Sequence, residues 1–133
     1  MKSKGFEIGE YRQEFNDLTK QEIPCGKIYQ AYGFKEHIKN RHPSDVGLVN
    51  KIPDVIKSPD YVGKDPNRGE SLELIKQGHK NIKLCLEWDM KENYMYASTI
   101  FSITNQDLKK FVSKGRWKKY KPSSKKARRK PKT

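Results

Sequence analysis

Four side chains in a stretch of six residues carry the groups that metal-independent cleavage of RNA would need. These are His37, Lys39, Arg41 and His42. In such a reaction one group accepts the proton of the 2′-hydroxyl, a second protonates the 5′-oxygen, and a cation stabilises charge developing on the phosphate. Imidazoles can supply both proton transfers, and lysine or arginine the cation. The same spacing also fits a histidine that hydrogen-bonds a helix end beside a solvated basic face, so both interpretations remain open.

Other reactive arrangements have less support. His37 and His42 are five residues apart, not the four that direct two imidazoles at one metal ion, and Glu36 faces about 100° away from His37 on a helix. No phosphate-binding or dinucleotide-binding glycine motif occurs. Cys25 and Cys85 lie far apart and outside any zinc spacing, which predicts free thiols. The sequence therefore predicts neither a metal site nor a cofactor.

Length and composition favour one small domain. The chain has 133 residues, of which 33% are hydrophobic, and a net charge of +13. No apolar run approaches the ~18 residues of a membrane span. Glu7 and Glu10 stand where a signal peptide would need apolar residues. We therefore expect a soluble, cytoplasmic protein without a membrane partner.

The positive charge is concentrated at the C-terminal end. Residues 114–133 hold eleven of the 29 basic residues and none of the 16 acidic ones. Because this segment is poor in apolar side chains and contains Pro122 and Pro131, we expect it to be largely disordered from about Lys121 onward. Such a tail could bind nucleic acid phosphates with release of counterions. A solubilising end, or a patch that an acidic protein covers, would have the same composition.

Helical periodicity dominates the first half of the chain. Residues 1–26 form a lead-in segment in which Tyr11, Phe15 and Leu18 share one helical face. Residues 27–41 are compatible with a helix, although Gly33 weakens its middle and a start near Phe34 would serve equally well. Pro43 ends this helix at His42.

After Pro43, the hydrophobic periodicity indicates one more helix and then a series of strands. Ser44 or Asp45 can cap a helix that continues to Lys57, with Pro53 tightening or kinking it. Strands are predicted at 61–63, 71–77, 82–88 and 94–103, the last two joined as an antiparallel hairpin, and a final helix at 105–112 with Thr104 as its cap. The expected fold is α+β, with N-terminal helices packed on a small antiparallel sheet of about four strands.

Three segments together resemble a known nuclease family. They are His-Ile-Lys-Asn-Arg-His-Pro at 37–43, Ile-Pro-Asp-Val-Ile-Lys-Ser-Pro-Asp-Tyr-Val-Gly at 52–63 and Tyr-Ala-Ser-Thr-Ile-Phe at 96–101. In this order they are similar to the phage-associated branch of the barnase/EndoU/colicin/RelE-like nucleases, over about residues 27–112. The resemblance implies a helix followed by a four-stranded antiparallel sheet, and a nuclease domain over 27–113.

The resemblance also implies a function and a set of residues. The function is metal-independent endoribonuclease activity, as a toxin or phage-borne effector in the cytoplasm of a bacterium or infected host. His37, Arg41 and His42 match the helix motif, Lys39 lies between them, and Ser71, Ser98 and Thr99 occupy strand positions that could face the same cleft.

RNA is the expected partner, and an acidic immunity or antitoxin protein would be a second. Basic residues of a loop, of the end of the domain and of the tail are the expected nucleic-acid contacts: Lys64, Arg68, Arg116, Lys118, Lys119, Lys121, Lys125, Lys126, Arg128, Arg129 and Lys130. Two alternatives stay open. In one, the same cations only bind nucleic acid without cleaving it. In the other, the domain is inert and its tail docks onto an acidic partner.

Overall fold

A computed structural model describes residues 4–121 of the chain. Its strands are β1 (Phe6–Tyr11), β2 (Gly26–Gln30), β3 (Tyr61–Gly63), β4 (Ser71–Lys76), β5 (Asn81–Asp89), β6 (Tyr94–Ile103) and β7 (Trp117–Lys119). Its helices are α1 (Gln13–Thr19), α2 (Phe34–Arg41), the 3₁₀ segment η1 (Pro43–Lys51), α3 (Ile52–Lys57) and α4 (Asn105–Ser113). The disorder predicted for the tail concerns residues outside the described part of the chain. None of the helices within residues 4–121 is both long and apolar enough to cross a membrane.

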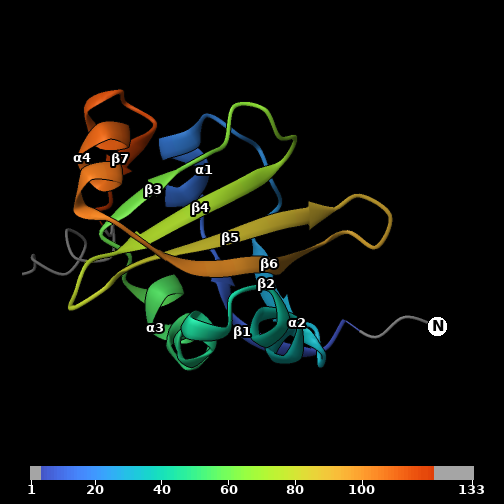
Figure 1. Cartoon of the computed structure of the whole chain (residues 1–133). Helices are drawn as coiled ribbons and strands as arrows, with labels where there is room; N and C mark the ends of the chain where they lie inside the picture. The colour runs from blue at the N-terminus through green and yellow to red at the C-terminus, as the bar shows by residue number, and fades with distance from the viewer. Residues whose placement is uncertain (1–3, 122–133) are drawn as a thin grey trace, which may run out of the picture.

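All seven strands belong to one mixed sheet (Figure 1), in the order β1-β2-β6-β5-β4-β3-β7. Only β2 and β6 are parallel. The α+β class is confirmed, but the expected count of about four strands, all antiparallel, is wrong. The four predicted strands exist as β3 to β6, and three short strands extend the sheet at its two edges.

The three additional strands have weak sequence patterns. A register shift between Glu7 and Gly9 interrupts the alternation of β1. In β2, the five residues pair with β6 only at Ile28 and Tyr29. β7 has three residues, two of them exposed lysines. These strands form because neighbouring strands pair with them, which local periodicity does not record.

The helices also differ in detail from expectation. α1 confirms a helix in the N-terminal segment, whereas residues 26–30 form a strand and α2 begins at Phe34, the alternative start. The second predicted helix is divided into η1 and α3. Pro53 lies in the first turn of α3, where its missing N–H is not needed, so it begins this helix instead of kinking a longer one.

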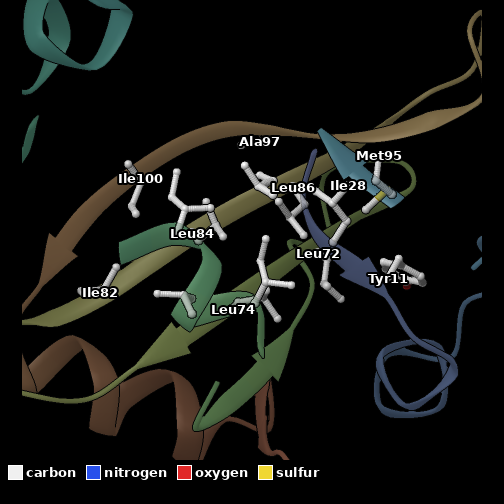
Figure 2. Packing of buried hydrophobic residues seen from close by; sticks show 14 of the residues in the cluster. Tyr11, Ile28, Leu72, Leu74, Ile82, Leu84, Leu86, Met95, Ala97 and Ile100 are labelled. Atoms are coloured by element: carbon white, nitrogen blue, oxygen red, sulfur yellow. The ribbon is translucent and has the colours of Figure 1, made fainter. Parts of the chain in front are cut away.

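The main core lies between α2, η1, α3 and one face of the curled sheet. Figure 2 shows leucines of β4 and β5 pointing into this interior together with Ile28 and Tyr11. Leu72, Leu74, Leu84 and Leu86 are completely buried. Because α3 contacts β1 as well as β4 and β5, the sheet wraps around this helix.

A β-bulge changes which residues of β6 face the core. Cys85 pairs with Thr99, but Leu86 pairs with Ala97, so Ser98 is the extra residue. Simple alternation would place Thr99 on the same face as Met95 and Ala97. The bulge instead buries Met95, Ala97 and Ile100 and turns Thr99 to the opposite face.

The opposite face is covered only at one end. There α4 and β7 form a second apolar cluster around Ile75, Leu108 and Trp117. Thr104 accepts a hydrogen bond from the Asp107 N–H at 3.0 Å, which confirms its predicted capping role. In Figure 1, α4 and β7 lie at the side of the sheet away from α2 and α3. The remainder of this face, over β4, β5 and β6, carries the polar side chains described next.

Candidate active site

A pocket of about 140 Å³ lies on the polar face of the sheet. Its polar lining comes from three strands and the loop between β3 and β4: Asp65, Arg68, Ser71, Glu73, Lys83, Cys85, Glu87 and Thr99, with Phe101 at one end. These strand residues form cross-strand rows, with Ser71 opposite Glu87, Glu73 opposite Cys85, and Cys85 opposite Thr99. The sheet register therefore brings them together.

Glu73 organises the floor of this pocket although only 3% of it is exposed. Arg116 binds its carboxylate with two hydrogen bonds, from Nε at 2.9 Å and Nη2 at 2.5 Å. Trp117 donates its indole N–H to the same carboxylate at 2.7 Å, and Lys83 Nζ lies 3.2 Å from it. Glu73 therefore fixes two cations against the sheet.

The ionisation of Glu73 follows from these contacts. Burial alone would raise its pKa, but the hydrogen bonds from Arg116 and Trp117 and the charge of Lys83 outweigh burial and hold the pKa below its usual value. Glu73 is thus an ionised carboxylate with its oxygens occupied. It is suited to positioning cations and not to proton transfer.

Gly63 permits the close approach of β7. A Cβ atom at this position would lie 2.2 Å from the Arg116 carbonyl oxygen and 2.5 Å from the Trp117 ring. Gly63 pairs directly with Trp117 across the β3–β7 ladder. The absent side chain therefore allows Arg116 and Trp117 to reach Glu73.

The β3–β4 loop supplies a third cation. Arg68 donates to Glu87 at 2.7 Å and lies 3.7 Å from Asp65. Lys64 Nζ donates to the carbonyl oxygens of Asp65 and Arg68, at 3.1 and 2.6 Å, and so holds the loop in shape. A hydrogen bond from the Asn67 N–H lowers the pKa of Asp65; desolvation opposes this effect, and the Arg116 and Arg68 charges add to it.

His42 is not part of the pocket lining, but it contacts Phe101, which forms one end of the pocket. The His42 ring stacks on the Phe101 ring, with centroids 5.5 Å apart. Lys83 Nζ lies 5.3 Å from the centroid of the same Phe101 ring. The turn that carries His42 is fixed nearby, since Ser102 donates to Asp45 at 3.1 Å and the Asp45 N–H donates to the His42 carbonyl. His42 thus has a defined position against Phe101.

The other predicted helix residues do not line this pocket. His37, Lys39 and Arg41 are exposed on α2, and His37 lies about 140° around the helix from His42. Ser71 and Thr99 line the pocket, but the helix residues with which they were expected to share a cleft do not. Ser98 donates to the Cys85 carbonyl at the bulge and is not part of the lining.

The predicted nucleic-acid contacts are distributed over two regions. Arg68 and Arg116 belong to the ion-pair network of the pocket. Lys118, Lys119 and Lys121 are exposed on β7 and just after it. The tail residues Lys125, Lys126, Arg128, Arg129 and Lys130 lie outside the described residues.

Glu73, Lys83 and Glu87 were missed as site residues. The sequence does contain a signal for them, because these three charged residues alternate with core leucines along β4 and β5. Alternation places them on the face of the sheet opposite the core. A sheet face with charges of both signs and no covering helix is a candidate site in itself.

The carboxylates of the pocket are engaged by cations. Glu73 is held by Arg116 and Lys83, and Glu87 by Arg68. No group of three or more His, Cys, Asp and Glu side chains within residues 4–121 is arranged to hold a metal ion. Burial raises the pKa of the Cys85 thiol to about 11 despite the neighbouring Lys83 charge, so this thiol is protonated at neutral pH and a poor nucleophile.

The fold and the pocket define a small α+β protein with a recess of mixed charge on an open sheet face. Its cations, Arg68 and Lys83, are of a kind that binds phosphate groups. A family model described as phage-Barnase-EndoU-ColicinE5/D-RelE like nuclease3 matches residues 7–110. The chain belongs to this family of phage-related nucleases, which confirms the resemblance in its sequence. Comparisons with curated proteins and with solved structures find no match.

Proposed function

We propose that this nuclease is an endoribonuclease that cleaves RNA by attack of the 2′-hydroxyl on the adjacent phosphate, without a metal ion. The observation that carries the proposal is the convergence of Lys83, Arg68 and Arg116 on a pocket that also contains the Thr99 hydroxyl. Cations held in place before the reaction stabilise charge developing on phosphate oxygens. The family supports nucleic acid cleavage in general, and the cation arrangement favours this particular chemistry.

The pocket can attract phosphate although its charges are paired. Glu73 is almost completely buried in the floor, whereas the Arg68 side chain is 60% exposed. A phosphate placed over the Cys85–Thr99 row would be within the same recess as Lys83 and Arg68. Guanidinium groups suit this position because they can bind two phosphate oxygens at once.

The two proton transfers are assigned to Glu87, at one end of the pocket, and to His42, which contacts Phe101 at the other end from outside the lining. Glu87 lies four residues from Lys83 on β5, or about 13 Å along the strand, whereas His42 contacts Phe101, the residue paired with Lys83. In-line displacement places the attacking and leaving oxygens on opposite sides of phosphorus. We assign Glu87 to accept the 2′-hydroxyl proton and His42 to protonate the 5′-oxygen.

The proposed step balances in atoms and charge. The bond from the 2′-oxygen to phosphorus forms, and the bond from phosphorus to the 5′-oxygen breaks. The products are a 2′,3′-cyclic phosphate and a free 5′-hydroxyl. His37, which lies outside the pocket, has no assigned role in this scheme.

Cleavage of a defined RNA by the purified full chain in excess EDTA tests the proposal. We expect fragments with 2′,3′-cyclic phosphate ends, and no cleavage of the same RNA carrying 2′-O-methyl groups. His42→Ala and Glu87→Gln should each lower the rate by about 10²- to 10⁴-fold. His37→Ala, the matched histidine control on the same helix, should cleave at close to the wild-type rate.

The outcomes separate the alternatives. Wild-type rates for both His42→Ala and Glu87→Gln would refute the assignment of proton transfer. Cleavage that requires a divalent ion would refute the metal-independent mechanism. Tight RNA binding without any cleavage would favour the alternative of a binding protein that uses the same cations.

A further inference from the structure

A second hollow beside the pocket carries only positive charge. It has a volume of about 380 Å³ and lies between the end of α1, the β3–β4 loop and the turn before β7. Its charged lining, which we call the basic groove, consists of Lys20, Lys64, Lys114, Arg116 and Lys118. Within residues 4–121, no aspartate or glutamate lines this hollow.

Tertiary structure brings these cations together from three separate segments. Lys20 is the left-handed cap residue of α1, with φ 56°. The turn containing Lys114 and Gly115 is closed by the Arg116 N–H, which donates to the Phe111 carbonyl at 3.0 Å. Lys118 is placed by its pairing with Val62. Arg116 is paired with Glu73, but the four lysines converge from distant parts of the chain and repel one another, and a bound polyanion would relieve this repulsion.

The basic groove lies next to the candidate active site, on the other side of the β3–β4 loop. Arg116 lines the groove and also binds Glu73 at the pocket floor. In the β3–β4 loop, Lys64 and Pro66 face the groove, whereas Asp65 and Arg68 face the pocket. A flexible chain that occupied both would pass over this loop.

We propose that the basic groove binds the phosphate backbone of single-stranded RNA next to the cleaved linkage; the identity of the polyanion as RNA rests on the proposed function. Lysines contact phosphates without reading bases, and no aromatic side chain lines the groove for stacking. The groove therefore selects for the length and flexibility of the RNA and not for its sequence. A single strand can bend over the loop, which a stiff duplex resists.

Two charge-matched triple variants of the full chain test this inference. The groove variant combines Lys20→Gln, Lys114→Gln and Lys118→Gln. The control variant combines the same change at three exposed lysines elsewhere: Lys35, Lys57 and Lys91. Binding is measured by titrating a fluorescent 12-nucleotide 2′-O-methyl RNA, which cannot be cleaved through its 2′-oxygen, at several salt concentrations.

In the groove variant, the slope of log affinity against log salt should be smaller in magnitude by about two, because each lost single-strand phosphate contact contributes about 0.7. Between 50 and 200 mM salt, wild-type affinity should therefore fall ~20-fold more than that of the groove variant. The control variant should keep the wild-type slope. Each single lysine variant should lose about 0.7, which provides the same test if the triple variant is poorly folded.

The results distinguish this inference from the proposed function. Equal slopes for the groove and control variants would overturn the inference, even if wild-type protein cleaves RNA as proposed. Tighter binding of a 12-base-pair duplex RNA would overturn its single-strand character. A groove-dependent slope in a protein that never cleaves RNA would support the groove and refute the proposed function.

Discussion

Glu73→Gln is the substitution with the largest expected effect on the pocket. It preserves the shape of the side chain but removes the charge that balances Arg116 and Lys83, both of which are mostly buried against Glu73. Removing one partner of a buried ion pair typically costs about 3 to 5 kcal/mol of unfolding free energy. Since Gln can still accept from Trp117, we expect the lower end, about 3 kcal/mol at pH 7.

The pH dependence provides an independent check on the cause. The pKa of Glu73 is lowered in the folded state, so its contribution is fully present above the usual carboxylate pKa and is lost as the pH falls through the folded value. The difference in stability between wild type and Glu73→Gln should therefore shrink progressively below about pH 4.5. A difference that stays constant down to low pH would mean that packing, and not charge, explains the loss.

Urea unfolding followed by circular dichroism measures both quantities. Glu87→Gln is the matched control, because it removes a carboxylate paired with the exposed Arg68 on the same strand face. Exposed pairs contribute about 0 to 1 kcal/mol, so this variant should remain close to wild type in stability. Equal losses for the two variants would refute the view that Glu73 organises the site.

Three further predictions concern the core, the thiols and the tail. Leu84→Ala should cost about 2 to 5 kcal/mol in urea unfolding because Leu84 is completely buried, whereas Lys57→Ala should change stability by less than about 0.5 kcal/mol; similar losses would contradict the facing of β5. With a chromogenic disulfide at pH 8, exposed Cys25 should react quickly in folded protein and the partly buried Cys85 much more slowly, since burial raises the Cys85 thiol pKa to about 11. Equally rapid reaction of both thiols would contradict this difference in environment. Deleting residues 121–133 removes seven basic residues. If half of them contact phosphate, the slope of log affinity against log salt should fall in magnitude by about 2 to 3, while the single-turnover rate at saturating RNA stays unchanged. Loss of that rate in a folded variant would place the tail in the active site.

The sequence predicted the elements whose patterns are local. The leucines of β4 and β5 and the Thr104 cap define the central strands and the last helix by spacing alone. The motif at residues 37–63 indicated the family that the comparison then showed. Local signals were sufficient for these features because burial repeats at a fixed period within each element.

The site itself depends on pairings that no local pattern contains. The bulge at Ser98 reverses the facing of Thr99, and its presence cannot be read from an unbroken alternation of side chains. Arg116 meets Glu73 only because a three-residue strand pairs with β3. Sequence reasoning therefore selected the histidines of a recognisable motif and overlooked the charged face on which the cations converge.

The position of Arg116 and Trp117 near the end of the described chain has a consequence during synthesis. Chains emerge N-terminal end first, so Glu73 is made and β4 can pair with β5 before β7 exists. Until residues 116–119 leave the ribosome, Glu73 lacks its two hydrogen-bond partners from this segment, and one wall of the basic groove is missing. A nascent nuclease built in this order acquires its complete site only after residues 116–119 have left the ribosome, which is itself rich in RNA.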